Sequence, residues 1–128
     1  MTRAVADTSV FIARESGRRI DETELPDELA ISVVTVGELR AGVLAAADAA
    51  TRDRRLATFT GVLALDPIPI DQHVAETWAG LRVALRDAGR RMPVNDSWIA
   101  ATALSIGVPV VTQDDDYAGV PGLEVIQI

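Results

Sequence analysis

Residues 93–104, PVNDSWIAATAL, predict a helix that lies deep in the protein. Pro93 stops the preceding chain, Asn95 is a good N-cap residue, and the small apolar residues that follow are strong helix formers. Asp96 falls in the first turn, where the helix dipole stabilises a negative charge by about 0.3–1 kcal/mol. A helix-start aspartate has this structural explanation by itself, so the other acidic residues of the chain decide whether it also has a function.

The composition is that of one globular unit. The chain has 128 residues, 48% of them hydrophobic, and a chain of this length buries about two thirds of its unfolded surface in one core. We therefore expect a single domain over residues 1–128. The absence of cysteine excludes disulfides and thiolate metal sites, so any metal ion must be held by oxygen ligands.

The amino terminus shows no targeting signal. Met1, Thr2 and Arg3 lead directly into an apolar strand, without the charged, apolar and small-residue regions of a signal peptide. No apolar run approaches about 18 residues, the length that a membrane helix requires. These features predict a soluble, cytoplasmic protein with no membrane partner.

The charge of the chain is acidic overall but arginine-rich locally. The formal net charge is −7, which argues against binding of nucleic acid through bulk charge. Every basic residue is arginine, the side chain best suited to bidentate phosphate contacts, although solvated helix faces explain any single group equally well. Most of these arginines fall in three groups: Arg14, Arg18, Arg19; Arg52, Arg54, Arg55; and Arg82, Arg86, Arg90, Arg91.

Hydrophobic periodicity predicts alternating strands and helices. Strands are expected at 3–6, 29–33, 108–112 and 123–126, and helices at 10–17, 35–44, 51–63, 72–88 and from the 95–96 start to Gly107. Two prolines confine residues 65–70 to an edge strand or an extended connection. The order predicts an α/β fold with a mostly parallel central sheet flanked by helices.

Acidic residues recur where the predicted elements meet. Asp7 and Asp114 follow strands, Glu38 lies just beyond the second strand, and Asp96 begins its helix. Right-handed crossovers bring the carboxyl ends of parallel strands to one rim, where α/β ligand sites form. Asp7 alone is explained equally well as a helix cap, but four acidic groups in the same kind of position predict a cluster.

Clustered carboxylates require cations. Two carboxylates about 5 Å apart repel each other by about 3 kcal/mol at an effective dielectric constant of about 20. With only oxygen ligands available, Mg²⁺ is the expected ion and Mn²⁺ a possible substitute. Such ions activate water and stabilise a leaving oxygen, as in metal-dependent nucleases.

Four blocks of the sequence resemble one known family. Taken together and in order, they are similar to the conserved blocks of PIN-domain ribonucleases, and most similar to VapC-type toxins of toxin–antitoxin pairs. The resemblance implies a PIN-like three-layer fold and a metal-dependent endoribonuclease that cleaves cellular RNA, of the tRNA or rRNA class, with metal-activated water. The blocks are residues 5–10, 35–40, 95–103 and 111–117.

Residue by residue, the resemblance also implies a site. Asp7, Glu38, Asp96 and Asp114 match the family's catalytic, metal-binding carboxylates, and Asp116 matches a further metal-binding position. Thr112 matches a hydroxyl that the family places beside the metal, while Thr8 and Ser9 are expected to shape the turn after the first strand. The chain departs from the pattern at the extra acid Asp115 and at Trp98, which is expected to pack rather than to stack on RNA.

The resemblance implies partners as well. VapC-type toxins are held by a small VapB-like antitoxin, and they usually form homodimers. The predicted helical hairpin from Val34 to Leu63 offers a groove for an inserted helix, with Val43, Leu44 and Leu56 as its apolar positions.

Other functional classes fit less well. A haloacid-dehalogenase-like phosphatase needs a second acid two positions after Asp7, where this chain has Ser9, and a receiver domain needs a lysine, which is absent. His73, the lone histidine, is interpreted as a surface or cap residue. The remaining alternative is a catalytically silent PIN-fold module that acts only by binding a partner.

Overall fold

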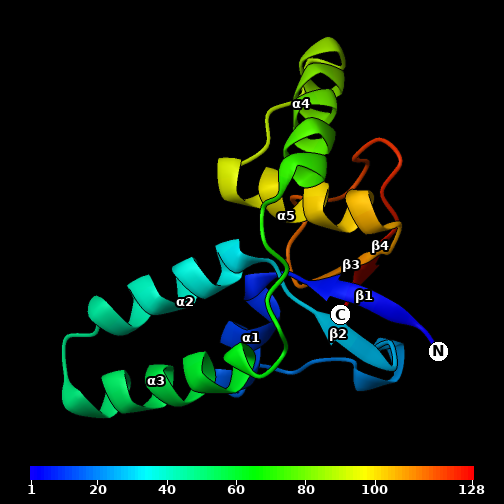
Figure 1. The fold of residues 1–128 in the computed structure, drawn as a ribbon. Helices are drawn as coiled ribbons and strands as arrows, with labels where there is room; N and C mark the ends of the chain where they lie inside the picture. Colours follow the sequence, from blue (N-terminus) through cyan, green and yellow to red (C-terminus); the bar gives the residue numbers. More distant parts are fainter.

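The computed structural model describes residues 1–128, with four strands and five α-helices (Figure 1). The predicted order of strands and helices is confirmed. A single 3₁₀ turn, Glu22–Glu24, lies in the acidic loop before the second strand. The elements are β1 (Arg3–Ala6), α1 (Thr8–Glu15), β2 (Glu28–Ala30), α2 (Val33–Leu44), α3 (Ala49–Leu63), α4 (Gln72–Asp87), α5 (Val94–Ile106), β3 (Val110–Thr112) and β4 (Val125–Gln127).

The four strands form one parallel sheet in the order β2-β1-β3-β4. Val5 lies opposite both Ala30 of β2 and Val110 of β3, so β1 occupies the interior of the sheet. The chain leaves β1 first toward β2 and later returns to its other side with β3. The carboxyl ends of β1 and β3 therefore flank the point where the strand order reverses, which is where open α/β sheets form ligand sites.

Alternation along the strands divides the core between the two faces of the sheet. Val5 and Val110 belong to a cluster that includes Ile99 of α5 and Leu85 of α4. The next residues along the same strands, Ala6 and Val111, belong instead to a cluster with residues of α1, α2 and α3. Buried alanines on α5 allow this helix to approach the sheet closely. Asp96, in its first turn, then lies near enough to Asp7 at the end of β1 for the Asp7 charge to act on it.

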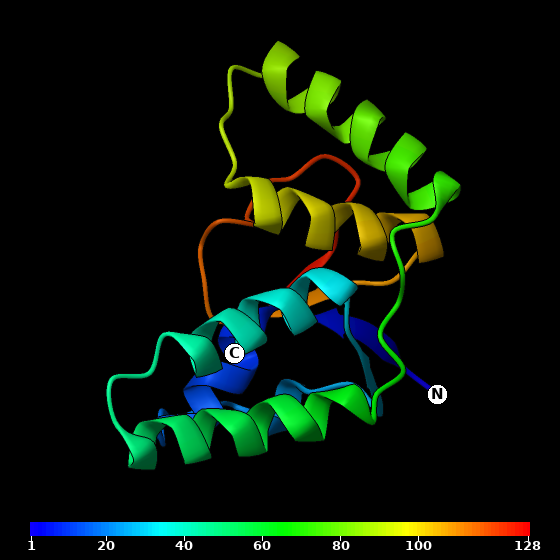
Figure 2. The same cartoon turned by 60° about the vertical axis from the view of Figure 1, so that its left-hand side comes forward.

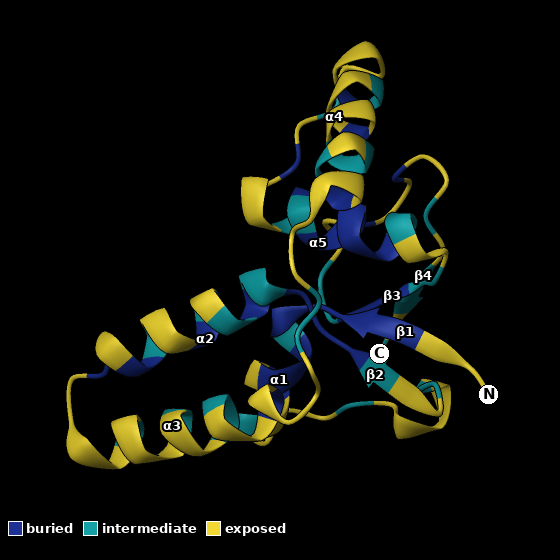
Figure 3. Cartoon of the chain, in the orientation of Figure 1, coloured by how far each residue is buried: buried dark blue, intermediate teal, exposed yellow.

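The helices cover the sheet in two groups. Helix α4 packs on α5, which contacts β1 and β3, while α2 and α3 form an antiparallel hairpin on the other side together with α1 (Figures 1 and 2). The predicted hairpin and the three-layer arrangement are thus confirmed. Much of α3 is exposed, and Val62 is its only buried residue (Figure 3). No helix has the length and apolar character needed to cross a membrane.

Two predicted helix starts were wrong. Helix α5 begins at Val94, with Pro93 in the N-cap position, so Asn95 is already inside the first turn and does not cap it. Helix α1 begins at Thr8, which places Thr8 and Ser9 in its first turn rather than in a separate turn. In both cases the helix begins earlier in the chain than local capping preferences predicted, and its first turn lies at the rim that carries the carboxylates.

The second strand is shorter than predicted. It ends at Ala30, and Ser32 caps α2 by accepting a hydrogen bond from the Val34 amide at 3.1 Å. Residues 65–70 make one parallel bridge, between Ile68 and Ser32, and form no strand. The two prolines restrict this segment to an extended connection, as predicted.

Of the apolar residues predicted to line a groove in the hairpin, one is buried in the core and the others are exposed. Val43 is 4% exposed and belongs to the core, so it does not line a groove. Leu44, Leu56 and Leu63 remain between 41% and 67% exposed. The hairpin therefore presents these three leucine side chains to solvent.

Candidate metal centre

Asp7 lies at the carboxyl end of β1 and is only 2% exposed. It occupies the N-cap position of α1 but makes no side-chain cap bond, so the simple capping interpretation was wrong. Its two carboxylate oxygens instead accept hydrogen bonds from the Thr112 hydroxyl, at 3.0 Å, and from the Tyr117 hydroxyl, at 2.9 Å. These donors hold a buried carboxylate in one orientation, at the rim between β1 and β3.

Glu38 reaches the same region from the second turn of α2. Its Oε1 accepts a hydrogen bond of 2.8 Å from the Thr8 hydroxyl, which also lies 3.0 Å from the hydroxyl of the buried Thr35. The Asn95 amide nitrogen lies 3.5 Å from Glu38 Oε2. Helices α1, α2 and α5 are therefore joined through the Glu38 carboxylate.

Asp96, in the first turn of α5, lies close enough to other carboxylates for their charges to change its pKa. Its half-burial, a side-chain hydrogen bond with Asp116 and the negative charges of Asp7, Asp116 and Glu38 raise the pKa of Asp96 to about 7. Burial and neighbouring negative charges both disfavour the ionised form of a carboxyl group. Asp96 is therefore electrostatically connected to two other acids of the predicted four, Asp7 and Glu38, and to the further predicted position, Asp116.

Asp114 joins the cluster from the end of β3. Its backbone amide donates to the Thr112 hydroxyl at 2.9 Å, and burial together with the Asp7 and Asp116 charges raises the pKa of its carboxyl group. The extra acid, Asp115, is exposed and accepts a hydrogen bond from the Gln127 amide at 2.9 Å. We use the name carboxylate cluster for Asp7, Glu38, Asp96, Asp114 and Asp116.

No residue forms an ion pair with the carboxylate cluster, and the charge of Arg18 only partly offsets the rise in the pKa of Asp114. The chain contains two ion pairs, Arg3–Glu28 and Arg86–Asp87, and neither involves the cluster. No three acidic or histidine side chains are close enough, as they stand, to hold one ion. The donor set nevertheless fits a hard divalent cation, because all five groups are carboxylates, and burial together with the neighbouring negative charges disfavours the ionised form of Asp96. Their metal-ligand assignment stays a prediction.

Several supporting residues were not predicted from the sequence. Tyr117 is fully buried, and burial together with the Asp7 charge raises the pKa of its hydroxyl, which therefore stays a donor. Thr35 orients Thr8, and Arg90 donates to the Asp116 backbone carbonyl at 2.7 Å. The available sequence signal was the lone tyrosine directly after three aspartates, since a buried hydroxyl needs a partner.

Trp98 packs, as predicted. Its ring stacks on Trp78 of α4, with ring centroids 4.2 Å apart and an angle of 3° between the planes. The Trp78 indole donates to the Ser97 hydroxyl at 3.0 Å. The pair thus fixes the first turn of α5, which carries Asp96, against α4. His73 lies 3.1 Å from the Ser105 carbonyl oxygen, near the end of α5.

Comparison with known proteins is consistent with this geometry. Residues 4–123 match the model of the PIN domain family. The chain is 52% identical to ribonuclease VapC5 of Mycobacterium tuberculosis over 97% of its length and 92% of the relative. It is 49% identical to ribonuclease VapC4 of the same organism, over 98% of its length and 97% of the relative. The chain therefore belongs to the PIN domain family, among the VapC ribonucleases.

Solved structures agree with the fold. The chain superposes with a TM-score of 0.91 and 46% identity on a chain in the crystal structure of VapBC-5, a toxin–antitoxin system of M. tuberculosis, covering 100% of both chains. A chain of DNA-bound VapBC from Salmonella typhimurium has a TM-score of 0.84 at 24% identity, covering 99% of this chain and 98% of that chain. At that identity the likeness concerns the fold alone. The predicted PIN-like α/β fold is confirmed.

Proposed function

We propose that the protein is an endoribonuclease toxin that hydrolyses phosphodiester bonds of cellular RNA, of the tRNA or rRNA class, with a divalent cation. The observation that carries this proposal is the carboxylate cluster, which gathers five acids, none of which forms an ion pair. Its membership of a family that includes named ribonucleases supports the same activity.

Asp7, Glu38, Asp96 and Asp114 are the proposed catalytic carboxylates, and Asp116 is a further metal ligand. Mg²⁺, or Mn²⁺ in its place, would supply activated water and stabilise the charge on the leaving oxygen. The donors described above limit the motion of these carboxylates. Thr112 and Tyr117 orient Asp7, and Thr8 orients Glu38. Preorganised carboxylates need little rearrangement when a cation and a phosphate arrive.

An RNA-cleavage assay tests the activity directly. Purified protein is incubated with bacterial tRNA and rRNA, with EDTA, with Mg²⁺ or with Mn²⁺, and fragments are mapped by primer extension. We expect cleavage with either divalent ion and none with EDTA. Intact RNA under all three conditions would favour the alternative of a silent binding module, while cleavage in EDTA would contradict the metal requirement.

The proposed regulator is a VapB-like antitoxin. Several similar structures are toxin–antitoxin complexes. A hollow of about 210 Å³ lies between α1, α2 and α3 and is lined by Ile12, Glu15, Glu38, Leu39, Gly42 and Arg55. Ile12 is 46% exposed and offers an apolar anchor there. A basic side chain of the partner would reach Glu38 from this hollow and compete with the metal ion.

Co-expression with the product of the adjacent small reading frame tests this partner. We expect a stable complex with suppressed cleavage, and we expect Ile12→Asp to weaken the complex while leaving RNA cleavage by the isolated protein intact. A matched Leu65→Asp variant, on a residue 37% exposed, controls for the general effect of a surface charge. Two proteins that purify separately would contradict the proposal. The proposed homodimer is tested by light scattering on the isolated protein.

A further inference from the structure

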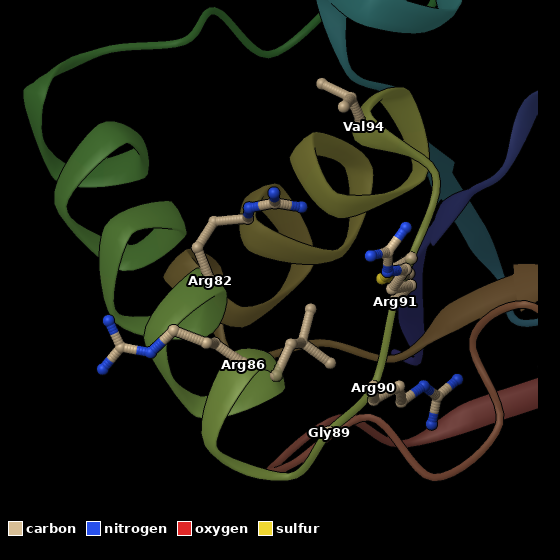
Figure 4. Close-up of a pocket in the computed structure, with 8 residues that line it drawn as sticks. Arg82, Arg86, Gly89, Arg90, Arg91 and Val94 are labelled. Atoms are coloured by element: carbon tan, nitrogen blue, oxygen red, sulfur yellow. The ribbon is translucent and has the colours of Figure 1, made fainter.

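Four arginines line a hollow of about 470 Å³ at the end of α4 (Figure 4). They come from the last turns of α4 and from the segment that joins α4 to α5. The buried side chains of Leu85 and Met92 line it as well, together with Val94, which is 56% exposed. We use the name arginine hollow for this feature, and its charged residues are Arg82, Arg86, Arg90 and Arg91.

The charge of the arginine hollow is poorly compensated within the protein. Its lining contains no acidic residue. Arg86 pairs with the adjacent Asp87 at 3.2 Å, but both side chains are more than 60% exposed, and such a pair contributes little. Arg91 takes part in no ion pair, and Arg82 lies over the Trp78 ring, 5.6 Å from its centroid. A third of the basic residues of this acidic chain therefore lie in the arginine hollow. The repulsion between their positive charges favours the binding of an anion there.

Arg90 links the arginine hollow to the carboxylate cluster. Its guanidinium donates to the backbone carbonyl oxygens of Asp116, at 2.7 Å, and Ala118. Gly119 has a φ of +74°, and a Cβ atom there would lie 3.0 Å from the Arg90 guanidinium, so the acidic loop is shaped around this arginine. On the other side, Arg91 precedes Asp96 by five residues. The two regions are therefore neighbours.

The geometry points to the arginine hollow as the subsite that binds the phosphodiester backbone of RNA beside the cleaved bond. This inference rests on the proposed function and assigns Arg82, Arg86 and Arg91 to phosphate binding. Arg90 acts as a positioning residue because its guanidinium already binds two backbone carbonyl oxygens of the acidic loop. Planar guanidinium groups bind phosphate oxygens in a bidentate manner, and the apolar floor of the hollow accepts a ribose or the face of a base. An extended polyanion reaches both this open site and the carboxylate cluster, which a free phosphate does not.

The test compares two variants that remove equal charge. Arg86→Gln/Arg91→Gln changes the arginine hollow, whereas Arg52→Gln/Arg54→Gln changes two exposed arginines on α3, across the molecule (Figure 1). Binding of a labelled single-stranded RNA is measured in EDTA, where no cleavage occurs, at several salt concentrations. We expect the hollow variant to bind about tenfold more weakly and its log–log salt slope to fall by about 1.4, because each lost phosphate contact on single strands removes about 0.7. The control variant should change affinity less than about twofold.

Three results would overturn the inference. Equal losses in both variants would show that only net charge matters. An unchanged RNA affinity with an altered association state, measured by light scattering, would assign the arginine hollow to a protein interface. Competition by inorganic phosphate as strong per phosphate as that by RNA would assign it to small anions.

Cleavage kinetics separate this inference from the proposed function. With Mg²⁺ present, the hollow variant should raise KM with kcat nearly unchanged, since it removes binding that is uniform along the reaction. Cleavage with an unchanged KM would overturn the subsite and leave the nuclease proposal standing. RNA binding that depends on the arginine hollow, without any cleavage, would support the subsite and contradict the nuclease proposal.

Discussion

The carboxylate cluster and the arginine hollow lie side by side with opposite charge, and the protein holds them in different ways. Two of the carboxylates are held by donors from other elements, Asp7 by the hydroxyls of Thr112 and Tyr117 and Glu38 by the hydroxyl of Thr8. The guanidinium groups of Arg82, Arg86 and Arg91 are exposed and rest on α4 and its following segment alone. Neither region neutralises the other through an ion pair.

This difference separates two kinds of ligand recognition. A group of like charges built around one buried, preorganised carboxylate favours a small, strongly bound cation and depends on geometry. An exposed group of like charges favours a polyanion and depends on ionic strength. Substitutions in the carboxylate cluster should therefore act mainly on the chemical step, and substitutions in the arginine hollow mainly on binding.

The largest effect is expected from Asp96→Asn. Asparagine keeps the size of the side chain in α5 but loses the charge that would hold the ion, so cleavage should fall about a thousandfold or more. RNA affinity in EDTA should be unchanged or slightly increased, because a negative charge is removed beside the arginine hollow. Circular dichroism serves as the folding control. A folded Asp96→Asn protein that cleaves RNA at the wild-type rate would contradict the site.

A graded series in the acidic loop is expected next. Asp114→Ala should lower kcat about a hundredfold, Asp116→Ala less, and Asp115→Ala by less than about threefold, because Asp115 faces Gln127 and not the cluster. Single-turnover cleavage rates measure the three effects. A larger loss for Asp115→Ala than for Asp114→Ala would show that the register assigned to the last block is wrong.

The pH dependence of stability tests the crowding of charge. The Asp96 pKa is raised from its ordinary value of 3.8 to about 7, so between these values the folded state binds more protons than the unfolded state. The resulting stabilisation is complete below pH 3.8 and is lost as pH rises through about 7. In EDTA, denaturant titrations should therefore show wild type losing stability relative to Asp96→Asn over this window. A constant difference would contradict the crowding.

Protons released on cation binding provide a second measure of the crowding of negative charge in the carboxylate cluster. Cation binding to the carboxylate cluster at pH 6–7 should displace the proton that Asp96 retains. Calorimetric titration with Mn²⁺ should then give different apparent enthalpies in two buffers of different ionisation enthalpy. Asp96→Asn is the matched control, and its two enthalpies should agree. Equal enthalpies for the wild-type protein would show that no proton is released.

A smaller effect than that of removing a cluster carboxylate is expected from Tyr117→Phe. The substitution keeps the buried ring but removes the donor to Asp7 Oδ1, so the free energy of unfolding should fall by about 1–2 kcal/mol. The cleavage rate should fall about tenfold or less, since Thr112 still orients Asp7. Urea titrations with an unchanged m-value measure the stability term. No change in either quantity would show that Thr112 alone holds this carboxylate.

Local patterns in the sequence were sufficient for most of the fold. The 3.6-residue period of α4, with Val74, Leu81 and Leu85 buried, and the apolar runs of β1 and β3 reflect the local geometry of single elements. The predicted acidic positions after strands also followed from topology, because parallel strands end at one rim. The first residues of α1 and α5, near that rim, could not be predicted from the sequence. Thr8 begins α1 and Pro93 occupies the N-cap position of α5, because packing sets the length of these helices.

What only the tertiary structure decided is which side chains support the charged ones. Tyr117 donates to Asp7 across 110 positions of the chain, and Arg90 shapes a loop 26 positions away. Hydrogen bonds at such separations leave no periodic signal in the sequence. The sequence by itself determined which acidic residues follow strands or begin helices, and it determined the family resemblance, because both depend on residue type and local spacing. The enclosure of Asp7 and the neighbouring arginine hollow arise only when distant segments pack, because burial and proximity are properties of the folded chain.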